Sequence, residues 1–193
     1  MTNLHQILDC DEATLNLILE FSRNSPRDLI NILRTIFDVH INNSDSIDSI
    51  PEIESIHEGI DKFCENKFKE IVTDGSQQSR LKRIKRTTFT IPLLANDIIK
   101  ENENKVRSMI MPWTRSGIVL TLSNRVKVNK SKLPVNMYVI NDLRVARYIL
   151  FNQPLGEFAN NNIFRCDECS QQIVFDKKMT STYMNLIVRI VKI

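Results

Sequence analysis

Apolar residues recur at helical spacing in the first third of the chain. They return every three or four positions after Asp11, which can cap a helix, again from Ser25 to about residue 40, and again over 52–72, where Asp74-Gly75-Ser76 ends the helix. This periodicity places apolar side chains on one face of a helix, so three amphipathic helices are predicted. The second begins with Ser25-Pro26-Arg27-Asp28, where a serine N-cap, a proline at the first helical position and an acidic residue form a capping box.

The pattern changes in the middle of the chain, where short runs of β-branched residues alternate with helical segments. Such runs, bounded by polar turns, are typical of strands. The predicted elements are a strand over 87–91, a helix opened by Pro92, a helix over 104–114, strands over 118–122 and 135–140, and a helix over 142–151. Together with the helix before them, these elements follow the order of a winged helix, a helix-turn-helix fold with a β-hairpin.

The chain is therefore predicted to be mainly α with a small β-wing, an α+β fold in three parts. The polar segment 42–51 ends in proline and marks a boundary between a helical part, 1–50, and a winged-helix domain, 51–150. Residues 151–193 form a C-terminal β-rich extension in this prediction, because alternating apolar residues recur near its end.

Charge is distributed unevenly along the chain. Residues 1–79 carry 6 Lys/Arg against 15 Asp/Glu, whereas residues 80–150 carry 15 against 4. A concentrated basic region favours a polyanionic partner, most simply nucleic acid. No run of apolar residues is long enough for a transmembrane helix and no signal-peptide pattern is present, so a cytoplasmic protein without membrane contact is expected.

The winged-helix prediction assigns the basic residues to three elements of a DNA interface. A recognition helix fits the major groove, and a basic wing follows the backbone or enters the minor groove. The recognition helix offers Lys105, Arg107, Ser108 and Arg115; the wing loop, 123–134, offers Arg125, Lys127, Lys130 and Lys132; an adjoining arm offers Arg80, Lys82, Arg83, Lys85 and Arg86. The arm could equally be a solvated linker or the polar face of a helix, and many winged helices bind protein instead.

Two segments resemble a known family. Ser25 to Ile30, following a helix that ends near Asn24, and Thr90 to Gly117, with Trp113, are similar to the C-terminal lid and winged-helix part of bacterial AAA+ and STAND-like P-loop ATPases. The resemblance makes 1–50 lid-like and implies that Arg27 senses the nucleotide γ-phosphate. The nucleotide-binding core is absent, since the sequence has neither a Walker lysine nor a Walker acid. Arg27 could instead be an exposed first-turn residue, and the chain could be a fragment of a larger ATPase or a separate subunit.

One short motif points to metal binding. Cys166 and Cys169 form a C-x-x-C, which is one half of a zinc knuckle, and zinc is the only cofactor that the sequence offers. A structural zinc site needs four ligands, and Cys10 and Cys64 lie alone within predicted helices. The alternative is a turn between two strands, over 162–165 and 172–175.

The sequence predicts no enzyme, because no histidine or carboxylate is arranged with a nucleophile. The leading hypothesis is a non-enzymatic DNA-binding winged-helix module that is the DNA-binding or regulatory part of a P-loop ATPase system. The alternative is a protein-interaction adaptor subunit of a multi-protein complex, whose partner would be a P-loop ATPase or another protein.

Overall fold

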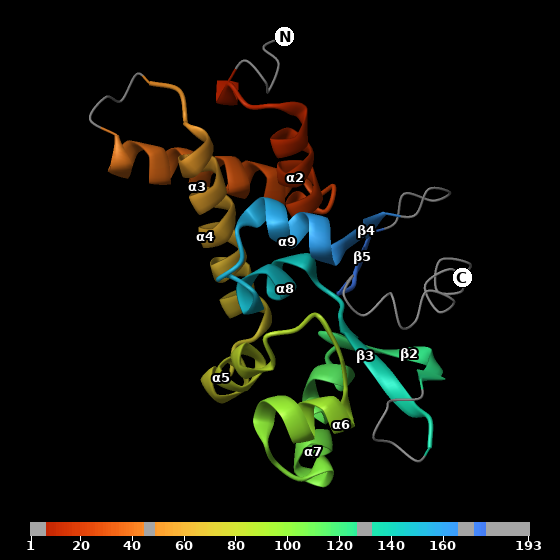
Figure 1. The fold of residues 1–193 in the computed structure, drawn as a ribbon. Helices are drawn as coiled ribbons and strands as arrows, with labels where there is room; N and C mark the ends of the chain where they lie inside the picture. The colour runs from red at the N-terminus through yellow and green to blue at the C-terminus, as the bar shows by residue number, and fades with distance from the viewer. Residues whose placement is uncertain (1–6, 45–48, 127–132, 166–171, 177–193) are drawn as a thin grey trace. The chain divides into compact units, whose positions relative to one another are not determined.

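The computed structural model describes residues 7–44, 49–126, 133–165 and 172–176 of the chain (Figure 1). The chain divides into two compact units, Met1–Ile71 and Val72–Ile193. The helix over 53–71 therefore groups with the first unit, whereas the sequence analysis placed the boundary near residue 50. The polar segment before this helix does not separate it from the helices that precede it.

Among its described residues, the first unit contains three long helices, α2 (Glu12–Ser22), α3 (Pro26–Asn43) and α4 (Ile53–Ile71). Two predicted caps are confirmed: an Asp11 carboxylate oxygen accepts the Thr14 N–H at 2.8 Å, and the Ser25 hydroxyl accepts the Asp28 N–H at 3.3 Å. These bonds satisfy N–H groups that have no partner within the helix. The core of this unit contains Ile18, Phe21, Ile32, Ile36, Ile56, Ile60, Phe63 and Phe68.

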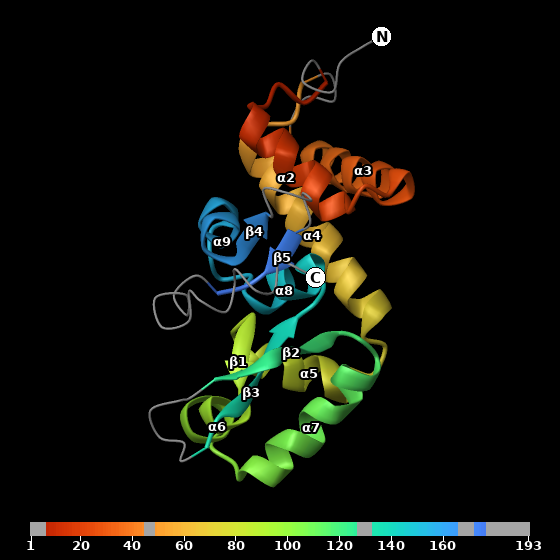
Figure 2. The ribbon, with the colours of Figure 1, turned by 90° about the vertical axis from the view of Figure 1, so that its right-hand side faces the viewer.

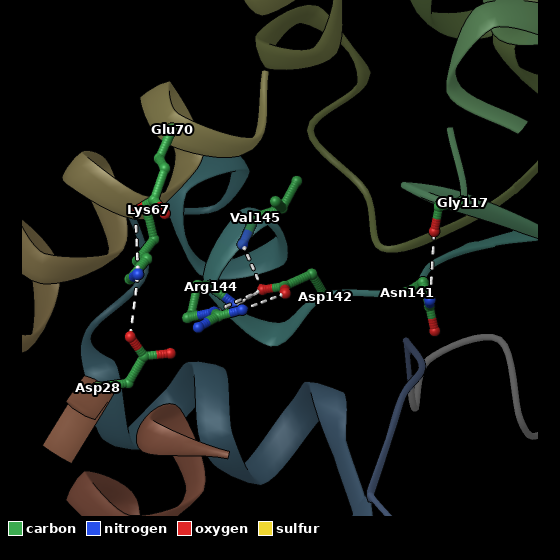
Figure 3. Close-up of polar contacts among 8 residues, drawn as sticks. All are labelled: Asp28, Lys67, Glu70, Gly117, Asn141, Asp142, Arg144 and Val145. Atoms are coloured by element: carbon green, nitrogen blue, oxygen red, sulfur yellow. Dashed lines mark hydrogen bonds and ion pairs between the residues drawn. The ribbon is translucent and has the colours of Figure 1, made fainter. Parts of the chain in front are cut away.

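Helices α3 and α4 approach closely at Gly59, where an added Cβ would lie only 2.6 Å from the Ile36 Cα atom. An ion pair also links the same two helices, because Lys67 Nζ of α4 lies 2.9 Å from Asp28 of α3 (Figure 3). Lys67 Nζ also lies 2.9 Å from Glu70 within α4. Partial burial lowers the pKa of Lys67, but the hydrogen bonds from Lys67 to Asp28 and Glu70 outweigh it, and the net pKa is raised. Lys67 therefore stays charged in this packing.

The second unit contains a three-stranded antiparallel sheet formed by β1 (Thr88–Thr90), β3 (Val135–Ile140) and β2 (Val119–Val126), in that spatial order. β3 is the central strand: Thr88 pairs with Val139, and Val119 pairs with Ile140. Two further strands, β4 (Ile163–Arg165) and β5 (Gln172–Val174), form a separate antiparallel pair. The chain is thus mainly helical with a small sheet, as predicted.

The other described elements of the second unit are helices, several of which contact the sheet (Figure 2). They are α5 (Gly75–Ile84), α6 (Ile91–Leu93) with the π-helical turn η1 (Leu94–Ile99), α7 (Glu103–Arg115), α8 (Leu143–Ile149) and α9 (Leu155–Asn162). Trp113 of α7 is fully buried, as are Phe89 and Phe158. Among the described helices, none is both long and apolar enough to cross a membrane.

Two parts of the second unit differ from the prediction, and a third decides between two predicted alternatives. The helix before Asp74 ends at Ile71, as expected, but the Asp74 carboxylate also accepts N–H groups from Ser76 and Gln77 and begins α5, which was not predicted. Residues 80–84 belong to α5, so of the two alternatives for this stretch of the basic arm the helix is found and not the linker. The C-terminal extension is not simply β-rich, because α9 precedes the pair of strands.

The start of α8 is held by a buried ion pair. Asp142 accepts the Arg144 backbone N–H at 2.9 Å and the Arg144 side chain at 3.0 and 2.7 Å (Figure 3). Both side chains are only 11% exposed. Nearby, the Asn141 side chain donates to the Gly117 carbonyl at 3.2 Å, which ties the end of β3 to the turn between α7 and β2.

Candidate nucleic-acid interface

A cleft with a cavity volume of about 530 Å³ lies between α5 and the beginning of α7. Three cationic side chains line it, from Arg80, Arg83 and Lys105, together with one carboxylate, that of Glu101. The two arginines come from α5, and the lysine comes from α7. The structure thus brings part of the predicted arm and part of the predicted recognition helix to the same cleft.

Burial of apolar residues fixes which way α5 presents its cations. Leu81 and Ile84 are fully buried, while Arg80 and Arg83 are exposed. Residues three apart lie on the same side of a helix, so the two arginines are neighbours along α5. Leu81 and Ile84 have the same spacing and anchor an adjacent side of α5, about 100° around the helix, so both arginines lie at the edge of the buried face, where they line the cleft.

Helix α7 is oriented by the same principle. Val106, Ile110 and Trp113 are buried, so the polar residues of α7 face outward. The Asn102 side chain accepts the Lys105 backbone N–H at 2.9 Å and so caps the helix where it meets the cleft. The exposed residues on this helix include Lys105, Arg107, Ser108 and Arg115.

The exposed residues of α7 do not form one line. Ser108 and Arg115 are seven positions apart and project in nearly the same direction, because a helix has about 3.6 residues per turn. Lys105 and Arg107 are two positions apart and lie on opposite flanks of the exposed face. Lys105 and Ser108 line the cleft, whereas Arg107 and Arg115 do not.

Lys105 forms an ion pair with Glu101 at 3.0 Å. The two side chains are 68% and 46% exposed. An exposed pair of this kind contributes little to stability, so Lys105 can turn to an anionic ligand at small cost. The cleft therefore keeps an excess of positive charge.

The rest of the predicted basic arm is dispersed. Lys82 Nζ lies 4.6 Å from the Tyr148 ring centroid, and an Arg86 guanidinium nitrogen lies 3.9 Å from Asp176. Lys85 is exposed and ends α5 with φ of 49°. These three residues do not line the cleft, so only Arg80 and Arg83 of the arm contribute to it.

The predicted wing is only partly described. β2 extends to Val126, so Arg125 belongs to a strand, where it pairs with Asn136, and not to a loop. Lys127, Lys130 and Lys132 lie outside the described residues, and their role in DNA binding stays a prediction.

The remaining candidate sites are Arg27 and the pair Cys166 and Cys169. Arg27 is exposed on the first turn of α3, in the other unit, and its nucleotide-sensing role stays a prediction. Cys166 and Cys169 lie outside the described residues. Within the described ranges, no group of three or more His, Cys, Asp or Glu side chains could hold a metal ion.

Sequence reasoning did not identify the cleft or its apolar floor. Ile99, Val106 and Met109 also line the cleft, beside the polar residues Asn104 and Ser108. One residue, Asp74, could have predicted the α5 side of the cleft. Aspartate is a preferred N-cap, and a helix that begins at Asp74 places Arg80 and Arg83 on one side.

Comparisons with family models, with curated proteins and with solved structures find no match to this chain.

Proposed function

We propose that this protein is a non-enzymatic DNA-binding module whose second unit is a winged helix. The observation that carries the proposal is the convergence of Arg80, Arg83 and Lys105 on one cleft that contains a single carboxylate. Such a cleft attracts phosphate groups, which supply most of the affinity of proteins for DNA.

The element order and the sheet support the winged-helix part of the proposal. α5, β1, the α6–η1 segment, α7, β2 and β3 follow one another along the chain, and β3 lies between β1 and β2. In this arrangement α7 is the recognition helix, and Ser108 and Arg115 on its exposed face approach the major groove. The β2–β3 hairpin is the wing.

A salt titration of DNA binding tests the proposal. We expect a short fluorescent duplex to bind the full chain with a log–log salt slope of about −5, the value for about six neutralised phosphates. Replacing Arg80 and Arg83 with glutamine should weaken binding and make the slope shallower by about 2, because each lost phosphate contact removes about 0.9. Fluorescence anisotropy between about 50 and 200 mM salt measures both quantities.

The matched control removes the same charge from the other unit. Arg34 and Lys62 are both exposed, and the double change Arg34→Gln with Lys62→Gln should leave the affinity and the slope unchanged. A salt-independent wild-type affinity, or equal effects of the two double variants, would refute the proposed DNA interface.

A second candidate function is that of a protein-interaction adaptor. The observation that favours it is an apolar stripe on the outer side of α3, where Ile30 is 66% exposed, Ile41 is 47% exposed and Phe37 lies between them at helical spacing. Exposed apolar stripes of this kind often bind a partner. The family resemblance makes a P-loop ATPase the partner to test, by co-purification of wild type and an Ile30→Lys variant; loss of a stoichiometric partner from the variant would support the adaptor.

A further inference from the structure

The α5–α7 cleft is larger and more apolar than contact with a phosphate group requires. Its volume of about 530 Å³ lies within the range of small-molecule pockets, about 300–1,000 Å³. Its lining combines cations with Ile99, Val106 and Met109. Ile99 and Val106 are buried and Met109 is half-buried, so these side chains form a floor and not an outer rim.

The two kinds of lining correspond to the two parts of a nucleotide. Arg80 and Arg83 provide guanidinium groups that match the geometry of a phosphate. The apolar floor can cover one face of a base, while Asn104 and Ser108 carry the donors and acceptors needed for its polar edge. The positive end of the α7 dipole also lies here, because α7 begins at Glu103 beside the cleft.

We propose that this cleft binds one nucleotide, with its 5′-phosphate on Arg80 and Arg83 and its base against Met109 and Ile99. This goes beyond the proposed function, because the backbone of duplex DNA can be bound without lodging a base in a pocket. The nucleotide has two sources with the same chemistry, a free mononucleotide and the terminal nucleotide of a DNA strand.

Calorimetric titration of the full chain tests the site with deoxyadenosine 5′-monophosphate, deoxyadenosine and inorganic phosphate as separate probes. We expect the monophosphate to bind at least about tenfold more tightly than either of the others, because only it engages both the cations and the apolar floor. Equal affinities for the monophosphate and inorganic phosphate would overturn the proposal, and this comparison requires no variant.

Variants locate the binding. The change Arg80→Gln with Arg83→Gln should weaken monophosphate binding by at least about tenfold, since two charge-assisted contacts are lost. Met109→Gln should weaken monophosphate binding several-fold and leave inorganic phosphate unaffected. The Arg34→Gln and Lys62→Gln double variant is the control, and a monophosphate affinity that is the same in all three variants would place the ligand elsewhere.

A pair of DNA substrates separates this inference from the proposed function and identifies the source. A covalently closed duplex has no terminal nucleotide, whereas the same duplex cut open carries 5′-phosphates. Tighter binding of the open duplex than of the closed one assigns the site to a strand end, and equal binding assigns it to a free nucleotide. Binding of the closed duplex without selectivity for the monophosphate would overturn the nucleotide site alone, and selectivity for the monophosphate without duplex binding would refute the DNA interface alone.

Discussion

Replacing Gly59 with alanine should destabilise the first unit, although alanine is the better helix former. The alanine Cβ would lie 2.6 Å from both Cα and Cγ1 of Ile36 and 3.0 Å from its backbone nitrogen. Ordinary contact begins at 3.4 Å, so α3 and α4 would have to separate by at least about 0.8 Å. Side-chain rotation cannot remove a clash with a Cα atom, so the packing of the two helices must change.

The magnitude follows from two opposing terms. Overpacking of this kind costs about 1–3 kcal/mol, and the gain in helix propensity from glycine to alanine is about 1 kcal/mol. Since the clash involves backbone, the cost lies in the upper part of its range, and we expect a net loss of about 1–2 kcal/mol in the free energy of unfolding. Urea denaturation followed by far-UV circular dichroism measures it, and hydrogen exchange should show lost protection in α3 and α4.

Gly156→Ala is the control, because Gly156 lies in α9 with no atom within 4 Å of an added Cβ. This change should leave stability unchanged or raise it by about 0.5–1 kcal/mol. If Gly59→Ala raised the urea midpoint in the same way, the close approach of α3 and α4 would not exist in solution.

Three further changes test the second unit. Asp142→Ala should cost about 3 kcal/mol of unfolding free energy in urea, because it leaves the buried Arg144 guanidinium without this carboxylate, and a loss below about 1 kcal/mol would contradict the buried pair. Gly117→Ala should cost about 1–2 kcal/mol in a thermal melt through strain alone, since Gly117 has φ of 74° and no atom crowds an added Cβ; an unchanged melting temperature would argue against this turn. Hydrogen bonds led by those from Ser76 lower the pKa of Asp74 below 3.8, so its capping contribution is present above pH 3.8 and is lost as the pH falls through the lower, folded-state pKa. Asp74→Ala should therefore reduce helix content at neutral pH but not at strongly acidic pH, and a difference that persists in acid would refute the capping role.

The features that could be predicted from the sequence are those encoded within a few residues. The caps at Asp11 and Ser25 depend on a side chain and an N–H group three positions later, and both are present in the structure. The same rule failed at Asp74 because the glycine after it favoured the end of a helix over the start of the next one. A local pattern of this kind is ambiguous wherever one helix ends and another begins within a few residues.

The candidate site could not be predicted as a site, because its parts are distant in sequence. Lys105 follows Arg83 by more than twenty residues, and the intervening strand and π-helical turn decide whether the two meet. The π-helical turn is itself unexpected, since such turns are rare and have no firm sequence signature. The close approach at Gly59 is equally hidden, because periodicity reveals which face of a helix is buried but not how near its neighbour lies.

The structure also changes what the positive charge of 80–150 means for DNA binding. Arg144 and Arg147 are buried, at 9% and 2% exposure, so they hold α8 in place and cannot reach a polyanion. Lys82 lies against an aromatic ring, and Arg86 lies near a carboxylate. Apart from Lys82, the exposed cations on α5 and α7 are Arg80, Arg83, Lys105, Arg107 and Arg115.

Five such cations account for a log–log salt slope of at most about −4.5. A wild-type slope steeper than this requires further phosphate contacts, and the predicted wing lysines Lys127, Lys130 and Lys132 are the nearest candidates in sequence. Replacing all three with glutamine should then return the slope to about −4.5 and no further. A slope that stays steep after this change would show that DNA also contacts cations outside both the cleft helices and the wing, and the winged-helix mode of binding would have to be abandoned.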